Sequence, residues 1–301
     1  MLISVIIPTH NRCDLLGRAI ESVQKQTIND IEIIVVSDGS EDGTDEIMKK
    51  YIEDPRVKYI SYFPARGGNV ARNIGIKNSI GDYIAFLDDD DEWLPTKLEK
   101  QIHVLEMDSN VGLVYTGVHT IYVDEKIEYK SLSIYEGDAS KRILIDNFIG
   151  STSTVMLKKS VLNKAGSFDE EMPALQDFDL WIRVCQYVNV GLVPEELVNY
   201  YNYGNGGQVS SNTEKYEKAY SLIDMKYKRE ISNLSLLDKK KREANKFFLL
   251  GNKGMRNNNP ILARYYFRKY LKLFFSIKIL LYYILSFTNY SFILKLRSKL
   301  I

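Results

Sequence analysis

The chain has 301 residues, of which 45% are hydrophobic and 26% are charged. This length allows one large domain with an appendage, because single cores stop growing near about 250–300 residues. The composition excludes a disordered, a collagen-like and a disulfide-dense protein. Cys13 and Cys185 are the only cysteines, which is too few for a disulfide framework or a zinc site and suits a reducing compartment.

The net charge of +1 hides a strong asymmetry. Residues 1–213 contain 20 Lys and Arg against 33 Asp and Glu, whereas residues 214–301 contain 20 against 6. We therefore expect an acidic domain over 1–213 and a basic helical extension over 214–301. In the extension the cations alternate with aromatic and aliphatic residues, which is typical of a segment that lies on an anionic membrane surface. The alternative is a helical cap on the fold or an oligomer interface.

The N-terminus runs directly into an apolar stretch and lacks the basic region and the cleavage site of a signal peptide. The best charge-free apolar stretch, residues 279–294, has 16 residues and contains several polar ones, which falls short of the roughly 18 that a membrane span needs. We expect a cytoplasmic protein, peripheral on the inner face of the cell membrane if the extension binds lipid. Nucleic acid is not expected as a partner, because no recognised binding module accompanies the charge.

Short β-branched runs alternate with amphipathic stretches in the first half of the chain. Strands are expected at residues 2–7, 31–36, 57–61 and 83–87, and helices at 12–26, 43–53, 69–79 and 94–107. This series predicts an α/β fold with a mostly parallel sheet flanked by helices. Further strands are expected within 111–129 and at 153–157, and helices at 139–147 and 175–187. Beyond residue 212 the pattern is helical, with breaks near 233, 257–260 and 289.

Ligands of such sheets bind beyond the carboxyl ends of the strands. The fourth predicted strand ends in four adjacent aspartates, Asp88 to Asp91, and the second ends at Asp38. Neighbouring carboxylates repel one another, and a hard divalent cation such as Mn²⁺ or Mg²⁺ would offset that cost. The alternative is a solvated acidic turn before the next helix. The absence of a GxGxxG or GK[ST] loop excludes dinucleotide and P-loop sites.

Four segments, in this order, carry a family resemblance: SVIIPTHNR at 4–12, VSDGSEDGT at 36–44, FLDDDDEW at 86–93, and GSFD at 166–169 with QDFDLWIR at 176–183. Together they resemble the inverting family 2 glycosyltransferases, which have the Rossmann-like GT-A fold. The resemblance covers residues 3–183. It implies a metal-dependent enzyme that moves a hexosyl or N-acetylhexosaminyl group from a UDP-sugar to a hydroxyl of a glycan or lipid-linked acceptor, in bacterial surface polysaccharide synthesis.

The resemblance also implies a set of site residues. Asp90 would hold Mn²⁺ or Mg²⁺, and Asp177 would accept the proton of the acceptor hydroxyl, with Asp179 as its rival. Position 37, usually Asp in the family, is Ser here, and the His that relatives often carry near 200–204 is absent, so the third metal ligand is unassigned. The nucleotide-sugar-binding residues would be Pro8, Thr9, Asn11, Arg12, Asp38, Arg72, Asp88 and, at a variable position of the pattern, Asp89.

Other interpretations stay open beside this one. Asp177 alone fits a carboxylate at the start of a helix. A sugar-phosphate nucleotidyltransferase would share the architecture but should have a Gly-rich N-terminal loop, which residues 8–14 lack. A non-catalytic glycan- or membrane-binding protein on the same fold is the third possibility. Trp93 and Trp181 are expected in the core, the three histidines at structural or surface positions, and residues 204–211 in an acceptor loop.

Overall fold

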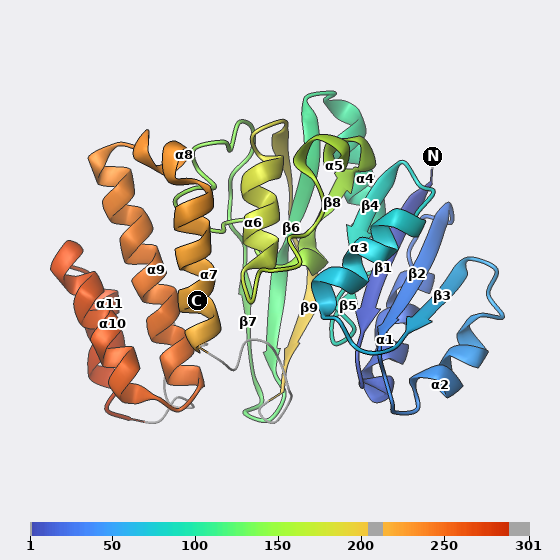
Figure 1. The fold of residues 1–301 in the computed structure, drawn as a ribbon, viewed down its shortest axis with the longest axis horizontal. Coiled ribbons are helices and arrows are strands. Elements are labelled where there is room, and N and C mark those ends of the chain that lie inside the picture. The colour runs from blue at the N-terminus through green and yellow to red at the C-terminus, as the bar shows by residue number, and fades with distance from the viewer. Residues whose placement is uncertain (1, 204–212, 289–301) are drawn as a thin grey trace.

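The computed structural model describes residues 2–203 and 213–288 (Figure 1). Its nine-stranded sheet has the order β3-β2-β1-β4-β8-β6-β9-β5, with β7 paired to β6. The strands are β1 (Ile3–Thr9), β2 (Ile31–Asp38), β3 (Val57–Tyr62), β4 (Tyr83–Phe86), β5 (Glu92–Trp93), β6 (Val111–Tyr122), β7 (Ile127–Ser131), β8 (Met156–Lys158) and β9 (Asn189–Asn202).

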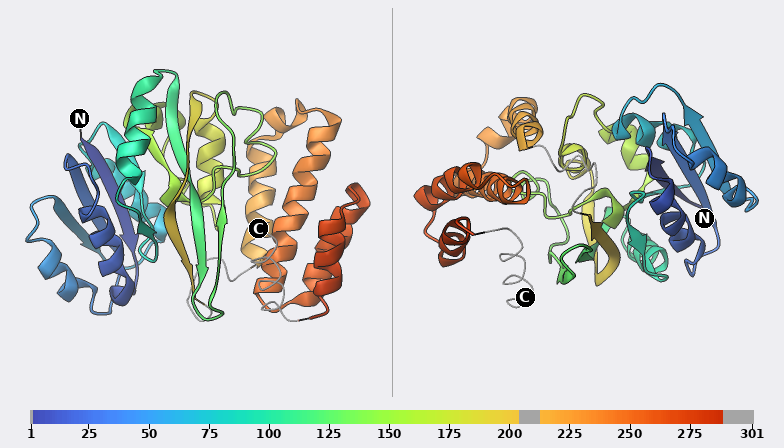
Figure 2. Two further views of the ribbon diagram at one scale, coloured as in Figure 1. Left: turned by 180° about the vertical axis from the view of Figure 1, so that it is seen from behind. Right: turned by 90° about the horizontal axis from the view of Figure 1, so that it is seen from below.

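Helices lie on both sides of the sheet and continue beyond it (Figure 2). They are α1 (Cys13–Gln24), α2 (Thr44–Tyr51), α3 (Gly68–Asn78), α4 (Lys97–Met107), α5 (Lys159–Ala165), α6 (Gln176–Val184), α7 (Thr213–Lys226), α8 (Lys228–Ser232), α9 (Leu236–Arg256), α10 (Pro260–Leu273) and α11 (Ile277–Leu285), with a 3-10 turn η1 at Thr152–Thr154.

The first four strands form the parallel half of the sheet. β1 pairs in parallel with β2 and β4, and β2 pairs in parallel with β3. Beyond β4 the sheet is mixed, because β8 is antiparallel to both β4 and β6 while β6 and β9 run in parallel. The predicted α/β class is confirmed, and its parallel series occupies the N-terminal half.

Alternate side chains of β1 enter two different cores. Ile3, Val5 and Ile7 pack with residues of α1, α2 and α4, whereas Ile6 packs with residues of α5 and α6. This division follows from the two-residue period of a strand. All seven residues of β1 are buried. A central strand that is buried on both faces needs an almost continuous apolar sequence, which explains the run of aliphatic residues in β1.

Residues 140–145 and β9 differ from the sequence-based prediction, and neither α5 nor β5 was predicted. Residues 140–145 form consecutive turns instead of the expected helix at 139–147, because Ile143 and Leu144 are buried in the main core and tertiary packing overrides the helical pattern. β9 was not expected. Pro194 interrupts its alternation, and its register with β6 shifts near Thr116 and Gly117.

The first helix after residue 212, α7, packs into the main core. Tyr220 and Ile223 of α7 belong to the same core as β4, β6 and β8, while α9, α10 and α11 share a smaller core around Phe267. The predicted helix breaks near 233 and at 257–260 are confirmed, and the one near 289 lies outside the described residues. The division at 213/214 stays a prediction. Across residues 2–203 and 213–288, every helix is too short or too polar to cross a membrane.

Candidate active site

A cavity of about 870 Å³ lies at the carboxyl ends of β1, β2 and β4. These three parallel strands end at the same edge of the sheet, where α/β proteins bind their ligands. Residues of α6, α7 and α9 form other parts of its wall. All the predicted site residues except Asn11 line this cavity, namely Pro8, Thr9, Arg12, Asp38, Arg72, Asp88, Asp89, Asp90 and Asp177.

Asn11 lies between two residues that line the cavity, His10 and Arg12, but does not line it itself. Its backbone has a left-handed φ of 51°. Its N–H donates a hydrogen bond to Ser40 Oγ (3.1 Å), and its Oδ1 accepts one from the N–H of Glu41 (2.7 Å). Asn11 therefore ties the loop after β1 to the loop after β2, and its predicted contact with the nucleotide stays a prediction.

Asp38 ends β2 and organises the loop that follows β3. Its Oδ1 accepts hydrogen bonds from the Tyr62 hydroxyl (2.7 Å) and the Arg66 N–H (2.6 Å), and its Oδ2 accepts one from the Gly67 N–H (2.7 Å). Gly67 has a left-handed φ of 99°, a conformation that glycine adopts without strain. The carboxylate is 4% exposed, so it is fixed at the cavity wall before any ligand arrives.

Two arginines neutralise the carboxylates that follow β4. Arg72 Nη2 lies 2.5 Å from Asp88 Oδ1, which also accepts a hydrogen bond from the Thr152 hydroxyl (3.1 Å). Arg12 Nη1 lies 2.8 Å from Asp89 Oδ1 and 3.0 Å from Asp90 Oδ2. These ion pairs explain how the adjacent aspartates are tolerated. They also bring two guanidinium groups, which suit phosphate recognition, to the same wall.

Burial perturbs two carboxyl groups of this run. It raises the pKa of Asp89 to about 6, although the nearby Arg12 cation acts in the opposite direction. Asp91 is fully buried, and burial, reinforced by the charges of Asp90 and Asp88, raises its pKa well above the usual range. The Ser153 hydroxyl donates a hydrogen bond to Asp91 Oδ2 (2.6 Å). Asp91 thus supports the turn from behind the cavity.

Asp177 lies in the first turn of α6 and faces the cavity. The helix follows Leu175, whose φ of 56° turns the chain into it. Asp177 Oδ1 accepts a hydrogen bond from the Phe178 N–H (2.7 Å), and Oδ2 accepts one from Asn147 Nδ2 (3.3 Å). Burial raises the pKa of Asp177 to about 6, while the nearby Arg72 cation lowers it. A carboxylate with this pKa is ionised at neutral pH and remains a useful proton acceptor.

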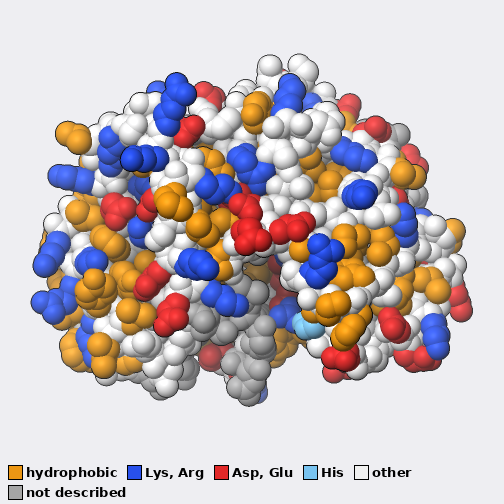
Figure 3. Space-filling view, viewed as in Figure 1, with side chains coloured by type: hydrophobic (Ala, Val, Ile, Leu, Met, Phe, Trp, Pro, Cys, Tyr) orange, Lys and Arg blue, Asp and Glu red, His pale blue; other side chains and the backbone are white. Residues whose placement is uncertain are grey.

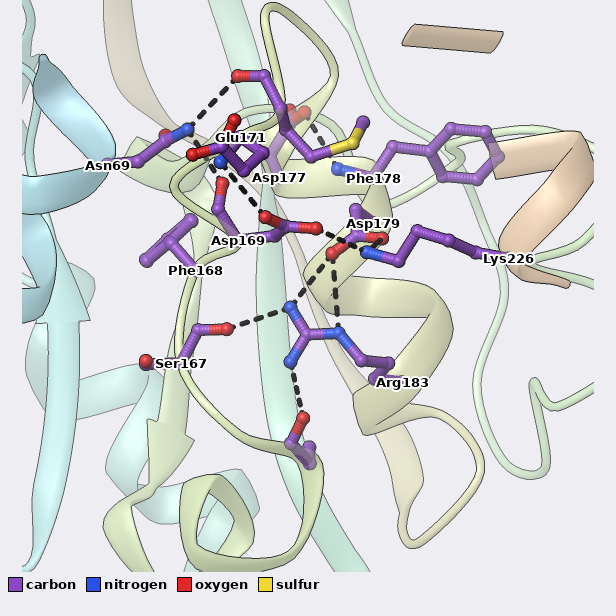
Figure 4. A network of polar contacts seen from close by, with 12 residues as sticks. Asn69, Ser167, Phe168, Asp169, Glu171, Asp177, Phe178, Asp179, Arg183 and Lys226 are labelled. Carbon is purple, nitrogen blue, oxygen red and sulfur yellow. Dashed lines mark hydrogen bonds and ion pairs between the residues drawn. The ribbon is translucent and has the colours of Figure 1, made fainter. Parts of the chain in front are cut away.

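Asp179, the alternative to Asp177 as the base, does not line the cavity but takes part in a buried ion-pair network (Figure 4). Its carboxylate is fully buried and lies 2.9 Å from Arg183 Nη2 and 2.5 Å from Lys226 Nζ. The Tyr227 hydroxyl also donates a hydrogen bond to it (2.8 Å). This network fastens α6 to the helices after residue 213. Trp93 and Trp181, at 2% and 0% exposure, lie in the core as expected.

The carboxylates that follow β4 fit a divalent cation whose remaining ligands come from water and the substrate. Within residues 2–203 and 213–288, no group of three or more His, Cys, Asp and Glu side chains is arranged to hold a metal ion. Mg²⁺ and Mn²⁺ commonly take only one or two protein carboxylates and fill their remaining positions with water and phosphate oxygens. Asp88 and Asp90 line the cavity and supply such oxygens. The expected acceptor loop at 204–211 lies outside the described residues.

Sequence reasoning missed the contribution of α7 and α9 to the site. No motif marks these helices, and the charge pattern pointed to a membrane or capping role instead. The cavity-lining residues of α9 recur at intervals of three, four and eight, which places them on one helix face. That spacing is the signal that could have found them. The residues are Lys215, Tyr216 and Tyr220 of α7, and Asn245, Phe248, Leu249 and Lys253 of α9.

Sequence comparisons agree with this geometry. The model of "Glycosyl transferase family 2" matches residues 4–166. An uncharacterized glycosyltransferase of Haemophilus influenzae is 28% identical over 88% of this chain and 89% of its own length. The Escherichia coli protein named UDP-Glc:alpha-D-GlcNAc-diphosphoundecaprenol beta-1,3-glucosyltransferase WfaP is 30% identical over 71% of this chain and 82% of its own.

Solved structures share the fold at low sequence identity. Residues 1–349 of Staphylococcus aureus TarS, in complex with UDP-GlcNAc, match 91% of this chain and 89% of that one, with a TM-score of 0.59 and 16% identity. The mannosyltransferase PcManGT of Pyrobaculum calidifontis, in complex with GDP-Man and Mn²⁺, matches 98% of this chain and 86% of that one, with a TM-score of 0.61 and 14% identity. These neighbours confirm the predicted GT-A fold, and the family match shows that the chain belongs to glycosyl transferase family 2.

Proposed function

We propose that the protein transfers a hexosyl or N-acetylhexosaminyl group from a UDP-sugar to a hydroxyl of a glycan or lipid-linked acceptor, with inversion at the anomeric carbon. One observation carries the proposal. A single cavity contains strand-end carboxylates paired with two arginines, and also a separate carboxylate, Asp177, where burial raises the pKa to about 6. The name of the E. coli relative and the ligand of TarS support a UDP-sugar, whereas PcManGT binds GDP-Man.

On the donor side, Thr9 and Asp38 are proposed to hold the uracil and ribose, with Pro8 beside them and Asn11 holding the adjoining loop in place. Arg12 and Arg72 are proposed to lie beside the diphosphate, Asp88 and Asp89 beside the sugar nucleotide, and Asp90 to hold Mn²⁺ or Mg²⁺. When bound, the cation would neutralise charge that develops on the departing UDP. The Mn²⁺ in the PcManGT complex supports the use of a metal.

On the acceptor side, Asp177 takes the proton of the attacking hydroxyl. The acceptor oxygen then forms a bond to the anomeric carbon while the bond from that carbon to the diphosphate oxygen breaks, and UDP leaves with the electron pair. Attack on the face away from the leaving group inverts the anomeric configuration. A general base of this kind typically contributes about 10²–10⁴ in rate.

We further propose that the extension rests on an anionic membrane and that the acceptor serves bacterial surface polysaccharide synthesis. Ile277, Leu281 and Ile284 of α11 are 67%, 48% and 53% exposed, and their spacing places them on one face of the helix. Hydrophobic and basic side chains lie side by side over α10 and α11, on the left of Figure 3. The diphosphoundecaprenol-linked acceptor in the name of the E. coli relative supports a membrane setting. An oligomer contact through this face is the alternative.

Release of UDP from a panel of UDP-sugars, measured with Mn²⁺ and with excess chelator, tests the proposed function. We expect Mn²⁺-dependent release from at least one UDP-sugar. Release of pyrophosphate from UTP and a sugar phosphate would instead support a nucleotidyltransferase. Binding of UDP-sugars without any turnover, across glycan and lipid-linked acceptors, would support a non-catalytic protein.

A further inference from the structure

Among the described residues of the extension, those that line the cavity wall and carry charge are all positively charged. They are Lys215 of α7 and Lys253 of α9, and the other lining side chains of these two helices are aromatic, aliphatic or amide groups. The strand-end wall, by contrast, is rich in aspartate. A substrate that spans the cavity therefore meets lysines and aromatic rings once it extends beyond Asp177 toward α7 and α9.

Lys253 lies on this wall, and no carboxylate of the described residues forms an ion pair with it. Its ammonium lies over the Tyr216 ring, 4.5 Å from the ring centroid, and makes no hydrogen bond or ion pair within the described part of the chain. Burial, with Arg256 on the same helix, lowers the pKa of Lys253 to about 7, and Asp177 of α6 acts in the opposite direction. A desolvated cation near another cation is costly, and a bound anion would offset that cost.

We propose that Lys253 binds a phosphate group carried by the acceptor, while Tyr216 and Phe248 cover the sugar to which that phosphate is attached. The inference rests on the proposed function, because it places the acceptor beside Asp177. A phosphate presents several charged oxygens, so it can contact the Lys253 ammonium and the Asn245 amide of the same helix face at once. A neutral sugar offers no charge to Lys253. The phosphate belongs to a lipid carrier or to a phosphodiester polymer.

The test compares acceptor probes in protein that is saturated with UDP and Mn²⁺. UDP then fills the site for the donor diphosphate, so a phosphate-bearing probe cannot bind there. The probes are N-acetylglucosamine 1-phosphate, its neutral methyl glycoside, farnesyl diphosphate-linked N-acetylglucosamine and a glycerol phosphate oligomer. Calorimetry is carried out on wild type, Lys253→Met and Lys253→Arg. Lys240→Met is the matched control, because Lys240 is exposed on the same helix and its loss changes the net charge equally.

We expect wild type to bind the phosphate-bearing probes at least about 10-fold more tightly than the neutral glycoside. Lys253→Met should lose that preference, whereas Lys253→Arg and Lys240→Met should keep it. In wild type the preference should fall from pH 7 to pH 8.5 as Lys253 loses its proton, and in Lys253→Arg it should not, because Asp177 is already ionised over this range. This comparison remains decisive if Lys253→Met fails to fold. Tightest binding of the lipid-linked probe assigns the phosphate to a lipid carrier, and tightest binding of the oligomer assigns it to a polymer.

Equal affinity of wild type for charged and neutral probes would overturn the inference, as would an unchanged preference in Lys253→Met. UDP titrations of the same samples separate this failure from failure of the proposed function. If UDP binds and the phosphate preference is absent, only the acceptor inference is wrong. If UDP does not bind wild type, the proposed function itself is wrong.

Discussion

Replacing Asp177 with Asn should make the ligand-free protein more stable at neutral pH and nearly inactive. Burial raises the pKa of this carboxyl group from an ordinary value near 4 to about 6. The folded protein therefore binds the proton more tightly than the unfolded chain does. The stability that results is complete below about pH 4 and is lost as the pH rises through about 6.

The size of the effect follows from that shift. Two pKa units correspond to roughly 3 kcal/mol. The buried Asp177 charge should lower the unfolding free energy of wild type by this amount at pH 7.5 and above. Asn carries no charge and keeps the hydrogen bond from the Phe178 N–H, but it loses the weaker one from Asn147 at 3.3 Å, worth up to about 1 kcal/mol. The net gain at pH 7.5 should be about 2 kcal/mol, and near pH 4 it should become a loss of up to about 1 kcal/mol, because only the lost Asn147 hydrogen bond remains.

The rate should change in the opposite direction. Loss of a general base should lower turnover by about 10²–10⁴, while UDP-sugar affinity is kept. Wild-type turnover should rise with pH through about 6, as Asp177 becomes ionised. The assays are denaturant unfolding at pH 4 and 7.5, calorimetry with UDP-sugar, and release of UDP in the presence of acceptor.

Asp179→Asn is the matched control, two residues along the same helix. It leaves Arg183 and Lys226 without their shared carboxylate, so it should destabilise the protein by about 3–5 kcal/mol at pH 7.5. The two variants should thus move stability in opposite directions. Near wild-type turnover for Asp177→Asn, or a loss of stability at pH 7.5, would refute the assignment of Asp177 as the base.

Three further predictions concern the donor site and the extension. Asp90→Ala should abolish the gain in UDP affinity that Mn²⁺ provides; calorimetry that finds the same affinity in excess chelator and in Mn²⁺ for wild type would contradict a metal role. Asp38→Ala should lower the unfolding free energy by about 2–4 kcal/mol, because it leaves three donors without an acceptor; an unchanged urea midpoint would show that the loop after β3 does not depend on it. Exchange of three exposed α11 residues for Asn should reduce flotation with anionic vesicles, whereas Ile80→Asn, a change at a site that is 77% exposed on the other half of the molecule, should not; equal loss in both would point to general hydrophobicity. The three are Ile277, Leu281 and Ile284.

The N-terminal half of the fold was predictable because short stretches of sequence determine its strands and helices. Short apolar, β-branched runs define β1 to β4, and the polar groups that follow each strand must meet at one edge of a parallel sheet. Asp38, Asp88 and Asp90 therefore reach the same cavity. Family position added Asp177, which no local pattern distinguishes from Asp179. Only the structure shows that the Asp179 carboxylate forms ion pairs with Arg183 and Lys226.

The rest depended on contacts between distant segments. Asn11 follows β1 as predicted, yet its side chain is used by the neighbouring loop. The turns at 140–145 bury Ile143 in a core that the local pattern does not encode. Lys253 looked like one cation of a basic extension, and its place in the cavity follows only from the way α9 packs against α7.

The most direct test of the central claim is release of UDP by wild type from the UDP-sugar that it binds best, measured with Mn²⁺, with excess chelator, and in Asp177→Asn. If the cavity at the ends of β1, β2 and β4 is a glycosyl transfer site, wild type with Mn²⁺ should release UDP in proportion to the glycosylated acceptor formed. Chelator and Asp177→Asn should each remove at least about 99% of that rate, while Asp177→Asn still binds the UDP-sugar. Turnover that persists in Asp177→Asn, or product with a retained anomeric configuration, would contradict it.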